Sequence, residues 1–210
     1  NTIVFFDEFN SIVEYIYNSS TLNRTREKVM MKVCDVLKNA KQLIMCDADI
    51  SDLCFDLLRH CGVDYKYILN KKKHNKGNEA HEYFDYKDMM CDIASDEKFI
   101  VCCDSKRECE NMAKYLEQEH QVKNIKLYTA DTDGHLTLDG HDKIIFSPKV
   151  IYGLDSQVER NVYCYYSEMT INPKAMLQQI SRSRNLKGFK VGYMFTRKKA
   201  TLSKYKNLEE

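Results

Sequence analysis

Short apolar blocks alternate with helical patterns along the whole chain, and this alternation limits the fold more than any other feature. A short continuous apolar run is typical of a strand that is buried on both faces of a sheet. Runs that are continuously or predominantly apolar predict strands at residues 2–6, 42–46, 65–69, 98–103, 124–129, 143–147, 161–166 and 189–195. Strands that alternate with helices predict an α/β fold with a parallel sheet and right-handed crossovers.

Helical spacing and helix-start signals fill the stretches between these runs. Apolar residues recur at helical spacing in 29–37, 50–58 and 109–116. Ser105 and Glu108 form a capping box at the start of the third of these helices. Asn172 followed by Pro173 predicts the start of another helix, because proline is favoured at the first helical position.

Composition excludes several classes of protein. Lysine and arginine number 32 against 31 aspartate and glutamate, a net charge of +1, so a nucleic-acid site must be a local patch. No apolar run approaches about 18 residues, the length that a membrane span needs. Nine cysteines without a CxxC pair favour small core residues in a reducing, intracellular compartment over disulfides or zinc. The basic segment 70–81 is a solvated connector or, alternatively, a phosphate-backbone contact.

Acidic residues follow the first two predicted strands. Ligands of parallel sheets bind at the carboxyl ends of the strands. Asp7 and Glu8 follow strand 2–6 there, as in nucleotide hydrolases where aspartate holds Mg²⁺ and glutamate orients water. The alternative is an ordinary acidic helix start. Asp47 and Asp49 follow strand 42–46 and would face the same cleft, unless Asp49 caps a helix.

Two later segments carry further candidates. In PKVIYGLDSQ, Gly153 lets the backbone turn near a ligand, and Asp155 could accept a ribose hydroxyl; a plain turn is the alternative. In QQISRSRN, Gln178 and Arg182 are helical neighbours, and the arginine can bind phosphate oxygens. Arg184 would face the other side if the helix stays regular, unless the helix ends first.

The order of these motifs resembles that of the superfamily 2 helicases from motif II to motif VI, across Asp7 to about Phe195. It is most similar to the herpesvirus origin-binding-protein helicases and the primase–helicases of large DNA viruses. The resemblance implies the C-terminal part of one RecA-like domain in 1–62, a second RecA-like domain in 63–196, and a basic tail in 197–210.

The resemblance also implies roles for the acidic and basic candidates. Asp7 would hold Mg²⁺ and Glu8 would activate water, with Phe9 and Asn10 completing motif II. Arg182 and Arg184 match motif VI, which contributes the arginine finger. Many members carry the second arginine three positions after the first, where this chain has Asn185, so either arginine could be the finger.

The remaining motifs are implied to bind ATP and nucleic acid. Motif III corresponds to 47–49, and Gly153, Asp155 and Gln178 would lie near ATP. Ser105 and Lys106 fall in motif IV, and Lys149, which replaces a frequent threonine, would lie toward nucleic acid. Ser105, Lys106 and Lys149 would contact a single strand or fork mainly through its phosphate backbone.

The chain contains no GxxxxGK[ST] loop, so it has no cradle of its own for the β- and γ-phosphates. We therefore expect a fragment, inactive alone, of an ATP-dependent DNA helicase in viral DNA replication. Its expected partners are other replication proteins or an attached primase domain, and a second copy of the same chain, in a homo-oligomer, is a further candidate. The alternatives are a non-catalytic RecA-like scaffolding or DNA-binding module and an RNA helicase of the same superfamily.

Overall fold

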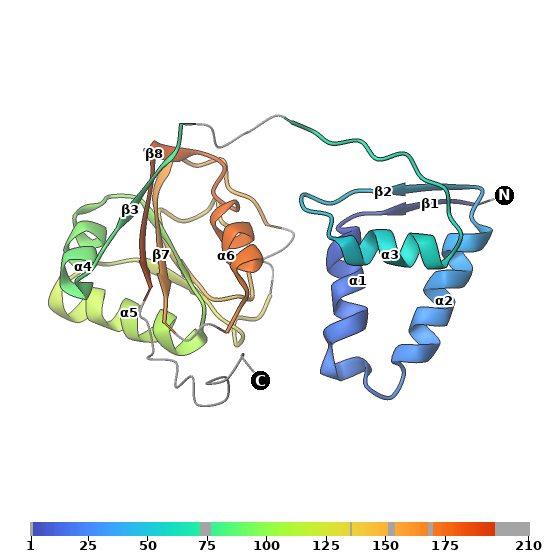
Figure 1. The fold of residues 1–210 in the computed structure, drawn as a ribbon. Coiled ribbons are helices and arrows are strands. Elements are labelled where there is room, and N and C mark those ends of the chain that lie inside the picture. The colour runs from blue at the N-terminus through green and yellow to red at the C-terminus, as the bar shows by residue number, and fades with distance from the viewer. Residues whose placement is uncertain (1, 72–76, 135, 151–153, 168–169, 196–210) are drawn as a thin grey trace, which may run out of the picture. The chain divides into compact units, whose positions relative to one another are not determined.

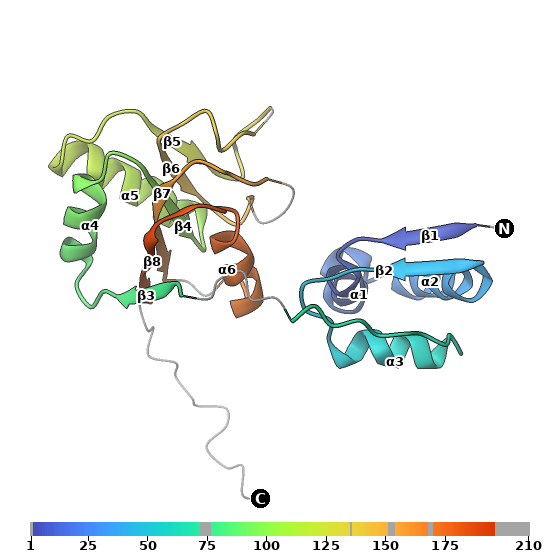
Figure 2. The same ribbon diagram turned by 90° about the horizontal axis from the view of Figure 1, so that it is seen from above.

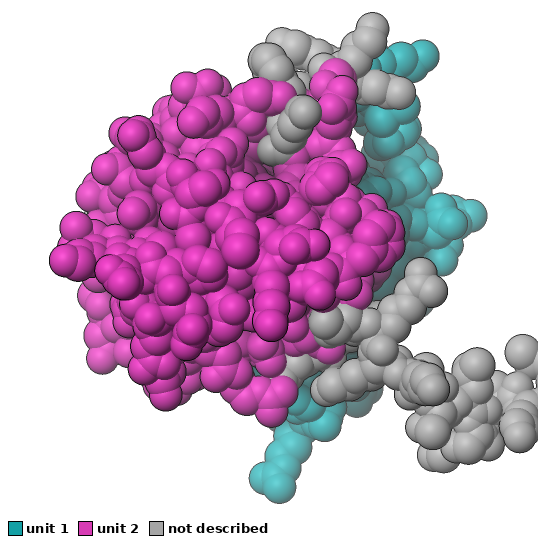
Figure 3. Space-filling model, turned by 90° about the vertical axis from the view of Figure 1, so that its left-hand side faces the viewer, with its two compact units in different colours: residues 1–72 teal, residues 73–210 magenta. Residues whose placement is uncertain are grey.

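The computed structural model describes residues 2–71, 77–134, 136–150, 154–167 and 170–195. The chain divides into two compact units, residues 1–72 and 73–210 (Figure 3). The first unit thus extends past Gly62, where we expected a domain boundary. The expected basic tail at 197–210 lies outside the described residues. Within the described part of the chain, no helix has the length and apolar character needed to cross a membrane.

The first unit is a two-stranded parallel sheet with its helices on one face (Figures 1 and 2). Its elements are β1 (Ile3–Phe6), α1 (Phe9–Asn18), η1 (Ser20–Leu22), α2 (Arg26–Asn39), β2 (Gln42–Met45) and α3 (Asp52–His60). The core lies between sheet and helices, where Phe9, Val13, Leu37 and Leu57 are buried together. Burial of these apolar side chains is the main force that holds the unit together.

The other face of this small sheet is open. Ile3 and Phe5 are 61% and 60% exposed, and Ile44 is 41% exposed. The prediction that strands 2–6 and 42–46 are buried on both faces is therefore wrong for this unit. The reason is that α1, α2 and α3 all pack on the face that carries the alternate residues, such as Leu43.

The third predicted strand, 65–69, is also wrong. This segment forms no strand in the structure and belongs to the first unit. The rings of Tyr65 and Tyr67 each lie 5.5 Å from the ring of Phe55 on α3. Two of its rings thus pack against a helix, whereas Ile68 and Leu69 are 79% and 60% exposed. The sequence pattern did not distinguish this arrangement from a place in a sheet.

The second unit is a six-stranded parallel sheet in the order β3-β8-β7-β4-β6-β5, with helices on both faces (Figure 1). Its elements are β3 (Glu79–Glu82), α4 (Tyr86–Ser95), β4 (Phe99–Cys103), α5 (Lys106–Glu119), β5 (Ile125–Tyr128), β6 (Lys143–Phe146), β7 (Arg160–Tyr166), α6 (Pro173–Ile180) and β8 (Leu186–Phe195). The predicted α/β class with a parallel sheet is confirmed.

The central strand β4 explains how the two cores form. All its residues are buried, and alternate side chains point to opposite faces. Val101 faces the core beneath α4 and α5, whereas Ile100 faces the core beneath α6. The predicted helix starts are confirmed: Ser105 Oγ accepts the Glu108 amide at 3.2 Å, and Asn172 Oδ1 accepts the Ala175 amide at 2.8 Å.

Candidate functional site

Asp7 and Glu8 form the short connection between β1 and α1. Glu8 has φ 54° and ψ 46°, the left-handed conformation that costs a residue with a Cβ about 1–2 kcal/mol. Residues held in this region cluster at functional sites. Asp7 is exposed, and its Oδ1 accepts the Glu8 amide at 3.1 Å. The two predicted acidic residues thus lie together at the carboxyl end of β1, with Asp7 open to solvent.

Asp47, after β2, is directed at the start of α1. Its Oδ2 accepts the backbone amides of Asn10 at 2.9 Å and Ser11 at 3.4 Å. A carboxylate is favourable there because the first amides of a helix lack partners within the helix. Asp49 is exposed, and its amide donates to Asp47 Oδ1 at 3.0 Å. The expectation that Asp47 and Asp49 face one cleft is wrong, since Asp47 caps α1.

Asn10 ties the same two loops together in the opposite direction. It is completely buried, and its Oδ1 accepts the Ser51 amide at 3.1 Å, the Ser51 hydroxyl, and the Cys54 thiol at 3.3 Å. Its Nδ2 donates to Glu14 Oε1 at 2.7 Å. The loop that carries Asp7 and Glu8 is therefore locked to the loop before α3. Sequence reasoning placed Asn10 in motif II but did not find this role.

In the second unit, Arg182 and Arg184 converge on Asp155. Arg182 Nη1 lies 3.2 Å from Asp155 Oδ1, and Arg184 Nη2 lies 3.0 Å from Oδ2. The expectation that the two arginines face opposite sides applies only to a continuing helix. Helix α6 ends at Ile180, so both residues follow it in a segment that turns them toward one carboxylate.

This group lies at the amino end of the sheet. Ser156 and Ser183 form a parallel bridge ahead of the first residues of β7 and β8. The expectation that all ligands meet the carboxyl ends is therefore wrong for Asp155. Gln178 contributes its carbonyl, which accepts from Arg182 Nε at 3.1 Å. Gly153 lies outside the described residues.

Ser105, Lys106 and Lys149 lie at the other, carboxyl end of the sheet, after β4 and β6. The Lys106 ammonium contacts the Asp131 carboxylate and lies 3.6 Å from Glu110 Oε1. The hydrogen bond to Asp131 raises the pKa of Lys106 above its ordinary value. Lys149 Nζ donates to the carbonyls of the same loop, at 3.3 Å for Ala130 and also to Thr132. The Ser105 hydroxyl serves as the α5 cap.

The two groups of the second unit are separated by the length of β7. Seven residues at about 3.3 Å each span roughly 20 Å. The arginine pair and the lysine pair are therefore two separate cationic groups of this unit.

Metal binding depends on the ligand sets that the described side chains offer. No set of three or more His, Cys, Asp or Glu side chains in the described segments could hold a metal ion. Mg²⁺ is commonly held by one or two carboxylates together with substrate phosphates and water, and exposed Asp7 fits that role.

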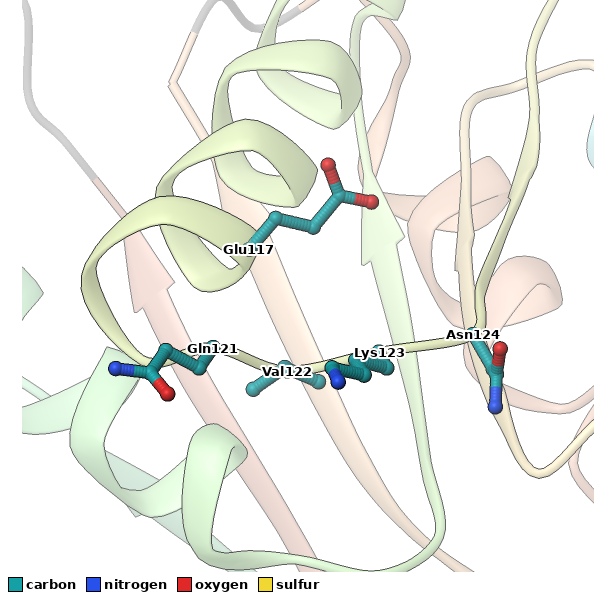
Figure 4. A pocket seen from close by; sticks show the side chains of 5 residues that line it. All are labelled: Glu117, Gln121, Val122, Lys123 and Asn124. Atoms are coloured by element: carbon teal, nitrogen blue, oxygen red, sulfur yellow. The ribbon is translucent and has the colours of Figure 1, made fainter.

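A surface hollow follows the end of α5 (Figure 4) and contains no candidate residue; Glu117, Gln121, Val122, Lys123 and Asn124 line it.

Comparisons with known proteins identify the fold. No family model and no curated protein sequence matches the chain. Among solved structures, the chain is similar to S. cerevisiae Dbp5 bound to RNA and ADP–BeF3, with TM-score 0.54, 12% identity, and coverage of 94% of this chain and 54% of that chain. It is also similar to Dbp5 L327V bound to Gle1 H337R and IP6, with TM-score 0.57, 11% identity, and coverage of 94% and 52%.

Dbp5 is a DEAD-box helicase of superfamily 2 with RecA-like domains. At this identity the likeness establishes a RecA-like α/β fold, as the motif order predicted. The chain spans about half the length of the Dbp5 chains that it matches.

Proposed function

We propose that this chain is the motif II to motif VI part of a nucleic-acid-dependent ATPase of the helicase type. The observation that carries the proposal is the convergence of Arg182 and Arg184 on Asp155. Two arginines that meet at one carboxylate beside a RecA-like sheet are suited to bind the oxygens of a phosphoryl group during its transfer. These oxygens would take the place of the Asp155 carboxylate. A structural ion pair needs only one arginine.

Each unit would contribute its own groups to ATP hydrolysis. In the first unit, Asp7 would hold Mg²⁺ together with the phosphates, and Glu8, fixed in its left-handed conformation, would orient the attacking water. In the second unit, Arg182 or Arg184 would stabilise the charge of the transition state, and Asp155 would hold both side chains ready. The chain has no GxxxxGK[ST] loop, so the phosphate cradle would come from elsewhere in the protein.

Nucleic acid would bind at the opposite end of the second unit. Lys106 and Lys149 are partly exposed ammonium groups on one loop-bounded edge, suited to backbone phosphates rather than bases. The motif order supports a DNA helicase of the origin-binding or primase–helicase type in viral DNA replication. RNA is the second candidate, because the similar Dbp5 structure is bound to RNA.

The test is ATP hydrolysis by the full-length protein, with single-stranded DNA, RNA or neither present. We expect stimulation by one nucleic acid, and a loss of at least about 100-fold in kcat for Glu8→Gln and for one of Arg182→Ala or Arg184→Ala. Lys114→Ala, which removes an exposed charge from α5, is the control and should hydrolyse ATP normally. Unchanged turnover in all three site variants would contradict the proposal.

The same protein separates the proposal from its rival, a non-catalytic scaffolding or nucleic-acid-binding module. A scaffold binds the oligonucleotide without hydrolysing ATP, and its affinity does not depend on nucleotide. A helicase changes its affinity for the strand between ATP-bound and ADP-bound states, because it couples the two ligands. Binding without turnover under all these conditions would favour the scaffold.

A further inference from the structure

A buried arginine lies directly behind the arginine pair. Arg160, the first residue of β7, is completely buried. Its Nη1 donates to Ser156 Oγ at 2.5 Å, and its Nη2 donates to the Leu138 carbonyl at 2.6 Å and to the His141 carbonyl. The guanidinium therefore fastens the loop before β6 to the segment before β7.

Ser156 connects this guanidinium to the site. It is also completely buried, and its hydroxyl donates to Asp139 Oδ1 at 2.7 Å. Its backbone amide donates to the Arg182 carbonyl at 2.8 Å, and its carbonyl accepts the Arg184 amide at 2.9 Å. Ser156 follows Asp155 directly, so a shift of Ser156 moves Asp155 and the backbone of both arginines together.

Burial of the Arg160 guanidinium is unfavourable if its only role is to stabilise the fold. Burying an ionised guanidinium costs several kcal/mol, and apolar replacements of buried charges often leave a protein equally or more stable. Burial lowers the pKa of Arg160, opposed by the nearby charges of Asp139 and Asp142. The Arg160 Nε even lacks a hydrogen-bond partner. Such a side chain is better explained by the geometry that it imposes on the backbone around it.

We propose that Arg160, acting through Ser156, is a positioning residue that sets how Arg182 and Arg184 meet Asp155. The inference rests on the proposed role of these arginines at phosphate. Only a planar guanidinium reaches the Ser156 hydroxyl and two loop carbonyls together. A lysine, a point charge on a flexible chain, keeps the charge but cannot hold all three groups in one plane.

The experiment compares Arg160→Lys, Ser156→Ala and Ser167→Ala in the full-length protein. Ser167 is the matched control, because it carries a buried hydroxyl without a partner just beyond the opposite end of β7. We expect Arg160→Lys and Ser156→Ala to lower kcat about 10-fold or more, with less than about a threefold change in KM. The control Ser167→Ala should leave both kcat and the thermal midpoint unchanged. Hydrogen exchange measured by mass spectrometry should quicken in peptides that contain 154–160 and 181–186 and stay unchanged in β4.

A second readout combines Arg160→Lys with whichever of Arg182→Ala and Arg184→Ala lowers kcat. If Arg160 acts through that arginine, Arg160→Lys costs little further kcat once it is gone, because the two losses are not additive. Fully additive losses would overturn the proposal, as would unchanged exchange in 154–160 and 181–186. If Arg182→Ala and Arg184→Ala are themselves silent in turnover, the proposed function fails, while the exchange result still decides whether Arg160 positions the segment. A variant that does not fold is replaced by Ser156→Ala alone, which deletes only the connecting hydroxyl.

Discussion

The backbone amide of Asn10 donates to the Asp47 carboxylate at 2.9 Å, although 37 residues separate them in the chain. In return, the Asn10 side chain accepts the Ser51 amide at 3.1 Å. The loops after β1 and β2 are therefore held by contacts in both directions. Glu8 lies between these contacts and β1, which explains how a left-handed backbone can persist there.

Removing the Asp47 carboxylate should weaken the first unit. Asp47→Ala leaves two amides of α1 unpaired and is expected to lower the free energy of unfolding by about 1–2 kcal/mol. Asp47→Asn keeps an oxygen acceptor and should lose less than half as much. Urea unfolding followed by circular dichroism measures both, with Asp35→Ala on the exposed side of α2 as control. Equal midpoints for Asp47→Ala and the control would show that the cap contributes nothing.

Much of the second unit was predictable from local patterns, but β3 (Glu79–Glu82) lies largely in the segment 70–81 that we expected to be a connector, and α4 was not predicted. All residues of 99–103 are apolar, and the Ser105 cap and apolar stripe of the next helix leave no alternative to a buried strand followed by a helix. The runs at 2–6 and 65–69 were also largely apolar, but their burial depends on what packs against them. That information lies in other segments of the chain, so one face stayed open and one run formed no strand.

The geometry of the candidate site was not predictable from the sequence. Motif order selected Asp155, Arg182 and Arg184 as candidates but not their convergence, because α6 ends at Ile180 without a glycine or proline to mark the end. Arg160 gave no signal, because one arginine before an apolar strand is typical of a solvent-exposed start. Its role arises from three contacts distant in sequence, which no local pattern contains.

Gly192 permits the close approach of two tyrosine rings to β8. A Cβ there would lie 2.8 Å from ring carbons of both Tyr163 and Tyr83. Gly192→Ala is therefore expected to destabilise the second unit by about 1–3 kcal/mol, the usual range for overpacking. Gly140→Ala is the control, because its added Cβ would meet only a Thr137 methyl at 3.6 Å. Thermal unfolding measures both, and equal midpoints would contradict the close packing.

Alkaline pH should unfold the second unit through its buried tyrosines. The Tyr163 hydroxyl donates to Asp96 Oδ2 at 2.7 Å, and burial together with this carboxylate raises the pKa of Tyr163 well above its ordinary 10.0. Burial and Asp92 raise the pKa of Tyr83 in the same way. Because the raised pKa belongs to the folded state, stability is complete below about pH 10 and falls above it, where the unfolded chain loses protons first.

Tyrosinate absorbance and circular dichroism, recorded in one titration, test this expectation. The exposed members of the 14 tyrosines should ionise first, and a delayed step should coincide with loss of helical signal. Tyr163→Phe is expected to make the fall of stability with pH shallower, since one buried hydroxyl no longer ionises on unfolding. If every tyrosine ionised with its ordinary pKa of 10.0 before any loss of structure, the buried environment of Tyr163 would be contradicted.

Asp131 should restrain nucleic-acid binding by occupying Lys106. Its carboxylate contacts the Lys106 ammonium where a backbone phosphate would bind, and both side chains are partly exposed, at 70% and 41%. Asp131→Asn removes this competing charge, so single-stranded oligonucleotides should bind several-fold more tightly at low salt. The slope of log affinity against log salt should steepen by about 0.7, the increment for one added phosphate contact on a single strand.

Fluorescence anisotropy with labelled oligodeoxythymidylate and oligouridylate measures the effect of Asp131→Asn. Glu117→Gln removes an acidic charge from the far half of α5 and is the control for net charge alone. An equal gain in both variants would show that the effect is nonspecific. Lys106→Ala in the Asp131→Asn background should abolish the gain, because the gain is expected to come from the freed ammonium. A gain that survives without Lys106 would assign the phosphate contact to another residue of this edge, with Lys149 the next to be tested by the same pair of variants.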